Sequence, residues 1–204
     1  VRLSRGRSPY TGVLAKGCRL CMRGAKLVLF VTGRCGKGCF YCPLSEERYG
    51  KDVVFANEIR VTQAEQALKE AHMTDAEGVG ITGGEPCLES DRTCHYLKAF
   101  KQELGAQFHA HLYTALEPVP LKRVSRLVDA GLDELRLHRF TAGGDLEKLR
   151  AVTKGAVDLG LEIPALPVRL EQMKRLLRDL DAARIDFVNL NELEFGPLNA
   201  DRLR

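Results

Sequence analysis

The chain has 204 residues and a mass of 22.7 kDa, enough for one domain and marginal for two. Hydrophobic residues make up 45% and charged residues 28%, which predicts a packed soluble globule and excludes collagen, a coiled coil and a disordered chain. The formal net charge is only +4, no apolar run is long enough to span a membrane, and no signal-peptide core is present, so we expect a cytoplasmic protein without membrane contacts.

The first 25 residues form a basic arm. Residues 1–26 contain seven Lys or Arg and no acidic residue. One interpretation is a solvated, poorly ordered terminus, and the other is an arm that approaches a polyanion such as RNA. The arm also holds Cys18 and Cys21 in C-x2-C spacing, which is half of a tetrahedral metal site. A second metal centre (an auxiliary iron–sulfur cluster or zinc) and two unligated thiols both fit this pair.

A strand-like apolar run over 26–32 leads directly into a glycine-rich loop with three cysteines. Cys35, Cys39 and Cys42 stand in C-x3-C-x2-C spacing, and Tyr41 precedes the third. Seven cysteines in a chain without an export signal favour metal binding over disulfides. Three thiolates can hold an iron–sulfur cluster and leave one iron open, as catalysis requires. A zinc knuckle with a fourth ligand elsewhere and a plain electron-transfer cluster are the alternatives.

The second strand, over 78–82, is followed by Gly83-Gly84-Glu85-Pro86. Two glycines make a flexible turn, and we expect the turn backbone and the Glu85 carboxylate to hold an ammonium group. Cys87 follows at once and would face the same end of the strands, where it is a candidate ligand or hydrogen donor. Cys94 lies on the apolar stripe of the next helix, so we expect it in the core.

The remaining chain alternates strands and helices. A helix over 62–71 opens with a Thr62–Glu65 capping box, and later helical stripes end at Gly131 and Gly160. Further helices are predicted over 91–104, 121–128, 146–159 and 173–180, and further strands over 108–113, 133–137, 161–166 and 185–190.

Strand starts recur every 24–30 residues from position 78 onward, the length that a strand, a crossover helix and two loops need. This spacing predicts an α/β protein with five βα units and a sixth strand, arranged as a partial (β/α)6 barrel of TIM type over residues 26–204. A flat doubly wound sheet is the competing topology. The tail would only begin a sixth helix, which leaves a truncated C-terminus as one interpretation.

The cysteine triad with Tyr41, in the loop after the first strand, and Gly83-Gly84-Glu85-Pro86 after the second resemble the radical S-adenosylmethionine (SAM) superfamily. The resemblance is greatest to the group around the pyruvate formate-lyase activating enzymes. It implies a partial barrel with a 4Fe–4S cluster on Cys35, Cys39 and Cys42, whose open iron binds SAM. It further implies that Gly83, Gly84, Glu85 and Pro86 contact the methionine moiety and that Tyr41 contacts the adenine.

Four residues at later strand ends extend the resemblance. Thr114 stands where activating enzymes carry a Thr-Asn-Gly turn, although the Asn-Gly is absent here, and His138 stands where they often have a Lys that touches SAM. Asn189 and Asn191 end the sixth strand, and the resemblance suggests the same SAM-binding role for them. The resemblance therefore adds these four residues to the candidate SAM-binding set.

The implied reaction is reductive cleavage of SAM to a 5′-deoxyadenosyl radical that removes hydrogen from an unidentified substrate, either an RNA base or a protein residue. It requires a one-electron donor of the flavodoxin or ferredoxin type. One rival is a non-catalytic iron–sulfur electron carrier, which predicts no SAM binding. The other is a zinc-bearing RNA-binding module centred on residues 1–42, which predicts a colourless protein.

Overall fold

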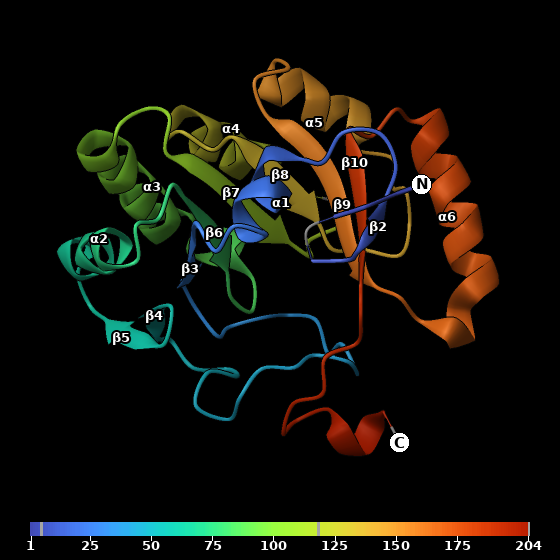
Figure 1. The fold of residues 1–204 in the computed structure, drawn as a ribbon, viewed down its shortest axis with the longest axis horizontal. Coiled ribbons are helices and arrows are strands. Elements are labelled where there is room, and N and C mark those ends of the chain that lie inside the picture. The colour runs from blue at the N-terminus through green and yellow to red at the C-terminus, as the bar shows by residue number, and fades with distance from the viewer. Residues whose placement is uncertain (5, 118, 204) are drawn as a thin grey trace.

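The structure is a computed structural model that describes residues 1–4, 6–117 and 119–203, so Arg5 of the basic arm lies outside it. One eight-stranded sheet organises the molecule, in the order β10-β9-β8-β7-β6-β3-β4-β5 (Figure 1). Its parallel strands follow one another in chain order. They are β3 (Lys26–Phe30), β6 (Gly78–Thr82), β7 (His109–Thr114), β8 (Glu134–Leu137), β9 (Asp158–Pro164) and β10 (Phe187–Asn191).

This strand order decides between the two predicted topologies. A doubly wound sheet reverses its order at a switch point, whereas a barrel adds each new strand beside the last. In the described part of the chain, each new parallel strand is added beside the last, as in a barrel. Among these strands β10 pairs only with β9, so the barrel stays open. The predicted partial barrel is confirmed. The helices that join its strands are α2 (Ala64–Met73), α3 (Ser90–Leu104), α4 (Leu121–Asp129), α5 (Leu146–Thr153) and α6 (Leu170–Ala182).

The two faces of the sheet differ in polarity. Alternate strand residues such as Leu29, Ile81 and Leu112 are fully buried, in one core cluster with Leu97 and Phe100 of α3. Burying these apolar side chains is the main stabilising contribution to the fold. None of the described helices combines the length and the apolar composition needed to cross a bilayer.

The opposite face of the sheet carries buried polar side chains, among them His109, Glu134 and Arg136. The short helix α1 (Lys16–Cys21) packs onto this face, against β3, β6 and β7 (Figure 1). That part of the predicted arm is therefore packed rather than solvated, while the division of the chain at residue 25 stays a prediction. Ahead of it lie β1 (Arg2–Leu3) and β2 (Pro9–Tyr10), which pair with each other.

Local predictions differ from the structure in three places. The helix α2 is capped by Gln63 and Gln66 rather than by Thr62 and Glu65, because the Gln66 side chain reaches back to the Gln63 N–H at 3.1 Å. The predicted helix over 146–159 ends at Thr153, and β9 begins earlier than expected, so Gly160 lies within a strand. The hairpin of β4 (Val54–Ala56) and β5 (Ile59–Val61) was not predicted.

The carboxyl ends of the parallel strands point toward the lower part of Figure 1, where the loop after β3 and the segment after β10 are drawn. Asn199 of that last segment donates to the Tyr41 carbonyl oxygen at 2.9 Å. The remaining elements are short 3₁₀ turns, namely η1 (Pro86–Glu89), η2 (Pro167–Arg169) and η3 (Ala200–Arg202).

Candidate active site

A cavity of about 300 Å³ lies at the carboxyl ends of the strands. Its size is at the lower end of the range for small-molecule sites. The three cysteines after β3 contribute to one wall, and all three are half-buried free thiols. Of the predicted SAM-binding residues, the lining includes Tyr41, Gly83, Gly84, Pro86, Thr114, His138 and Asn191, and it omits Glu85 and Asn189.

The cysteine loop takes its shape from a close backbone crossing at Gly33. The Gly33 N–H donates to the Lys51 carbonyl at 2.8 Å, and the Gly50 N–H donates to the Gly33 carbonyl at 2.9 Å. A Cβ at Gly33 would lie 1.6 Å from the Arg48 carbonyl oxygen, whereas one at Gly36 would have open space. Only a glycine fits the crossing, which ties the end of the loop back to its beginning.

The turn after β6 is bonded to this loop. The Gly84 N–H donates to the Thr32 carbonyl at 2.7 Å, and the Glu85 N–H donates to the Arg34 carbonyl at 2.8 Å. A Cβ at Gly84 would come within 2.4 Å of the Arg34 carbonyl oxygen. The two motifs that the sequence singled out are therefore held against each other as two sides of one cavity.

The Glu85 carboxylate differs from the expectation that it holds an ammonium group. It is buried, and Oε1 accepts from the Cys87 N–H at 3.0 Å and the Thr114 hydroxyl at 2.9 Å. Oε2 accepts from the Ala115 N–H at 2.7 Å. Burial raises the pKa of Glu85, although these donors oppose the shift. The side chain thus fixes the end of β7 to the turn after β6, and Gly83, Gly84 and Pro86 of this turn line the cavity.

Tyr41 and His138 form a bonded aromatic pair in the cavity wall. The His138 Nδ1 lies 2.8 Å from the Glu162 carbonyl oxygen, which can only accept, so Nδ1 carries the proton. His138 Nε2 therefore accepts from the Tyr41 hydroxyl at 3.1 Å. Burial lowers the pKa of His138, which keeps the ring neutral. Phe40 and Phe140 pack edge-on against the Tyr41 ring.

The cavity floor centres on Glu162, which the sequence analysis missed. Its Oε1 accepts from the Tyr113 hydroxyl at 3.1 Å and the Asn191 amide at 2.9 Å. Its Oε2 accepts from the Asn189 amide at 2.8 Å and from Arg136. Asn189 therefore lies beneath the floor rather than in the cavity. Charged residues within otherwise apolar strands, as in the runs around Arg136 and Glu162, were the available signal.

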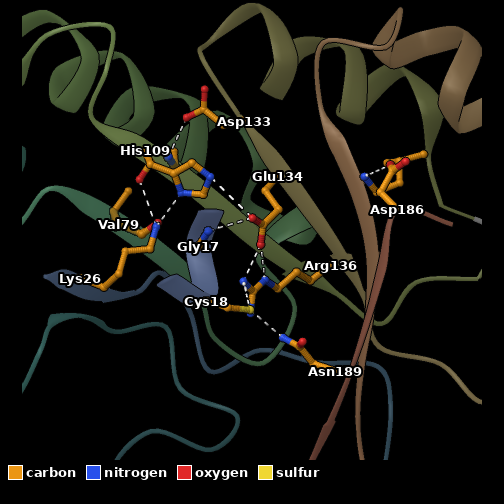
Figure 2. Close-up of polar contacts among 12 residues, drawn as sticks. Gly17, Cys18, Lys26, Val79, His109, Asp133, Glu134, Arg136, Asp186 and Asn189 are labelled. Carbon is orange, nitrogen blue, oxygen red and sulfur yellow. Dashed lines mark hydrogen bonds and ion pairs between the residues drawn. The ribbon is translucent and has the colours of Figure 1, made fainter. Parts of the chain in front are cut away.

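Below the floor, a buried polar cluster reaches from β3 to β8. Lys26 Nζ donates to the Val79 carbonyl at 2.8 Å and lies 2.9 Å from His109 Nδ1. Glu134 lies beside His109 and accepts from Arg136 Nε at 2.6 Å (Figure 2). Burial lowers the pKa of Lys26 to about 7 and that of His109 to about 3. This polar cluster contacts α1 through the Gly17 N–H, and Arg136 joins it to Glu162 of the cavity floor.

The two cysteines after the turn both lie in the core. Cys87 is fully buried, belongs to the hydrophobic cluster and is absent from the lining of the cavity. Its thiol packs beside Glu85, and burial raises its pKa to about 12. Cys94 is buried on α3, as expected.

The donor chemistry of this cavity wall suits a cubane cluster, because three free thiols line one side of the same cavity. Burial raises the pKa of Cys35 and Cys42, with the charge of the nearby Cys39 adding to it, and a bound metal would reverse this shift by replacing the protons. No three His, Cys, Asp or Glu side chains in the described part of the chain converge as a single ion requires. A 4Fe–4S cluster has different needs, because its three cysteines bind three separate irons.

Comparison with known proteins identifies the family. Residues 29–180 match the model of the radical SAM superfamily. The chain belongs to the radical SAM superfamily. Members of this superfamily are enzymes that use a 4Fe–4S cluster and SAM, and the recognition made from the cysteine triad and the Gly-Gly-Glu-Pro turn is confirmed.

One curated relative carries a name from the activating-enzyme group. Over 200 residues the chain is 45% identical to a protein of Methanocaldococcus jannaschii, covering 93% of this chain and 53% of that protein. The relative's name assigns it, provisionally, to the glycyl-radical enzyme activating enzymes. The chain spans about half the length of this curated relative.

Solved radical SAM enzymes share the fold. SuiB of Streptococcus suis bound to SAM superposes with a TM-score of 0.62 at 15% identity, over 88% of this chain and 44% of that one. Methylornithine synthase (PylB) gives 0.61 at 14% identity, over 86% and 56%. At these identities the likeness concerns the arrangement of strands and helices alone.

Proposed function

We propose that this radical SAM protein removes a hydrogen atom from a glycyl residue of a partner protein. The observation that carries the proposal is the single cavity shared by the thiols of Cys35, Cys39 and Cys42 and the turn at Gly83 and Gly84. The choice of a protein substrate rests on the relative in Methanocaldococcus jannaschii. An RNA base, suggested by the basic arm, is an outcome that the experiment below distinguishes.

In this proposal the three thiolates hold a 4Fe–4S cluster, and Gly83, Gly84 and Pro86 border the bound SAM. When bound, the cluster and SAM together supply a 5′-deoxyadenosyl radical that can remove a hydrogen atom. The role of the chain's own residues is to position the reacting groups and to exclude water from the site. The neutral His138 and the Tyr41 hydroxyl satisfy each other, so this wall offers no free proton to a reactive group.

The floor supports the same conclusion. Glu162 has four donors on its two oxygens, so the carboxylate is held fixed and its charge is compensated by Arg136. Radical chemistry needs a site from which water and side reactions are excluded. A saturated floor and an aromatic wall supply two sides of such a site, and the partner's glycine would close it from the open side.

Two further features complete the proposal. A protein of the flavodoxin or ferredoxin type would supply the single electron, because the family chemistry is reductive. We also propose a cytoplasmic location, since seven free cysteines suit a reducing compartment. A second metal at Cys18 and Cys21 stays a prediction, and metal content per chain tests it directly.

The test begins with anaerobic reconstitution with iron and sulfide, followed by dithionite and SAM. We expect a brown protein that forms 5′-deoxyadenosine, and the Cys39→Ala variant should lose both the colour and the product. Cys94→Ala is the matched control, because it removes a buried thiol that lies outside the cavity. A colourless, zinc-loaded protein would overturn the proposal, and a brown protein that leaves SAM intact would favour the electron carrier.

Substrate class is tested by isotope transfer. The active protein is incubated with a proteome of its source organism labelled with α-deuterated glycine, or separately with uniformly deuterated total RNA. Deuterium in 5′-deoxyadenosine from the labelled proteome alone is the expected result. Deuterium from the RNA alone would replace the glycyl substrate with an RNA base.

A further inference from the structure

The helix α1 is seated on the buried polar face by one close contact. A Cβ at Gly17 would lie 2.6 Å from Arg136 Nη2 and 2.7 Å from His111 Nδ1, so no larger residue fits. The Gly17 N–H also donates to Glu134 Oε2 at 3.1 Å (Figure 2). This seat fixes the position of the next residue, Cys18, over the middle of the polar face.

The two thiols of α1 have different surroundings. Cys18 Sγ is partly buried and accepts from the Asn189 amide at 3.1 Å and from Arg136 Nη2 at 3.4 Å (Figure 2). Cys21 is exposed. An amide and a guanidinium point hydrogens at the Cys18 sulfur, whereas Cys21 is open to a reagent from solvent.

The spacing of the pair suits a disulfide. Residues three apart in an α-helix have Cα atoms about 5 Å apart. Disulfides need a Cα separation of roughly 4.4–6.8 Å. Both cysteines belong to the same short helix, so their sulfurs can meet after side-chain rotation and a small adjustment at the helix end.

A metal ion fits this place less well. Two thiols supply half of a tetrahedral site, and among the described side chains no third His, Cys, Asp or Glu converges with them. The groups that contact Cys18 are instead the Asn189 amide nitrogen and the Arg136 guanidinium, which point hydrogens at the sulfur. A positively charged guanidinium and amide hydrogens at the sulfur oppose a cation at this place.

We infer that Cys18 and Cys21 form a reversible dithiol–disulfide pair that reacts with disulfides. In the reaction, the Cys21 thiolate attacks the oxidant disulfide and expels one thiol. The Cys18 thiolate then attacks the mixed disulfide at Cys21 and expels the second. The pair loses two protons and two electrons and gains an S–S bond, while the oxidant is reduced to two thiols.

The state of the pair reaches the cavity floor through shared donors. Asn189 Nδ2 and Arg136 serve both Cys18 and Glu162, and Glu162 lines the cavity. A disulfide sulfur is a poorer hydrogen-bond acceptor than a thiolate. Oxidation therefore weakens the bonds from Asn189 and Arg136 to Cys18 and leaves both donors more fully available to Glu162. The pair itself stands independently of the proposed function, and only its effect on the cavity rests on that function.

The chain offers a direct readout, because Lys16, Arg19 and Arg23 flank and separate the two cysteines. Trypsin cuts a reduced, alkylated pair into two peptides, residues 17–19 and 20–23, whereas a disulfide keeps these peptides joined. The cluster-loaded protein is equilibrated anaerobically with mixtures of reduced and oxidised dithiothreitol or glutathione, alkylated and digested. The expected result is a joined peptide, 2 Da lighter than the sum of the two thiol peptides by general mass balance, whose share follows the buffer ratio.

Asn189→Ala and Asn191→Ala are matched variants, because both amides bond Glu162 and only that of Asn189 bonds Cys18. Loss of a donor to Cys18 destabilises the reduced pair, so Asn189→Ala should move the equilibrium severalfold toward the disulfide while Asn191→Ala leaves it unchanged. A peptide that never joins at any ratio overturns the inference. The inference is also overturned if the protein binds one equivalent of iron or zinc at this place and the Cys18→Ser and Cys21→Ser variants no longer bind it. Neither result depends on SAM cleavage.

Discussion

The Glu85 carboxylate and the Thr114 hydroxyl are joined by a buried hydrogen bond of 2.9 Å that connects the turn after β6 to the end of β7. The same carboxylate accepts from the Cys87 and Ala115 N–H groups. The acid of the Gly-Gly-Glu-Pro turn therefore binds the protein's own backbone and a neighbouring hydroxyl. It fixes the relative position of two neighbouring strand ends, from which the cavity wall is built.

Replacement of this acid should cost stability. Glu85→Gln retains one acceptor oxygen but turns an NH₂ group toward either the Cys87 N–H or the Ala115 N–H, which leaves a buried donor unpaired. We expect a loss of about 1–3 kcal/mol in the free energy of unfolding, measured by anaerobic urea titration. Glu89→Gln is the control, since Glu89 pairs with the exposed Arg34 and should change stability by less than about 1 kcal/mol. Equal losses in the two variants would contradict the buried role of Glu85.

The crossing at Gly33 gives a second prediction. Gly33→Ala would place a methyl group 1.6 Å from the Arg48 carbonyl oxygen, so the segments before and after the cysteines must separate. We expect this variant to incorporate less than half of the wild-type iron and sulfide, measured by colorimetric assay after reconstitution. Gly36→Ala, which meets nothing within 4 Å, should load normally. Normal loading of Gly33→Ala would show that the crossing does not shape the cluster loop.

The elements predicted best were those with the clearest local pattern. The strand β6 and the helix α3 follow from an apolar run and from a stripe at helical spacing. The end of α5 could not be predicted in this way. Lys154 and Gly155 adopt left-handed φ angles of 50° and 70° there, whereas the apolar stripe continues beyond them. The β4–β5 hairpin has strands of only three residues, which are too short to show an alternating apolar pattern. The one local signal in the sequence was Asn57, a turn residue between flanks that contain Val and Ile.

That the three cysteines lie together in one loop could be predicted, because they are close in sequence. The floor could not, because Glu162 takes its partners from β7, β8 and β10, and no spacing rule links such positions. The same holds for α1, whose Gly17 reaches Glu134 across 117 residues. Polar residues on a buried face are satisfied by distant partners, and only the fold brings those partners together.

The buried Lys26 predicts a pH dependence of stability. Burial lowers its pKa to about 7 from the usual 10.5, so between these values the unfolded chain holds the extra proton. The free energy of unfolding therefore rises with pH across this window through this group. Relative to Lys26→Met, the wild-type protein should gain stability from pH 7 to pH 10 in urea titrations.

The comparison with a methionine variant separates Lys26 from the cysteines and tyrosines that titrate in the same range. Lys98→Met is the matched control, because the Lys98 side chain stays exposed to solvent in the folded protein. Its difference from the wild-type protein should stay flat over the window. A flat difference for Lys26→Met as well would show that the Lys26 ammonium keeps its proton at neutral and alkaline pH.

The last prediction concerns the buried ion cluster of Glu134, Arg136 and Glu162. The Arg136 guanidinium lies between the two carboxylates, and the Glu134 side chain is completely buried. Removing one member of a buried ion pair leaves an uncompensated charge, which costs about 3–5 kcal/mol. Arg136→Met should lose that much in the free energy of unfolding, and adding Glu134→Gln should recover part of it, because one of the two orphaned charges is removed. The exposed pair of Arg126 and Asp91 supplies the control, since Arg126→Met should cost less than about 1 kcal/mol. If the double variant is no more stable than Arg136→Met, the loss comes from packing rather than from charge.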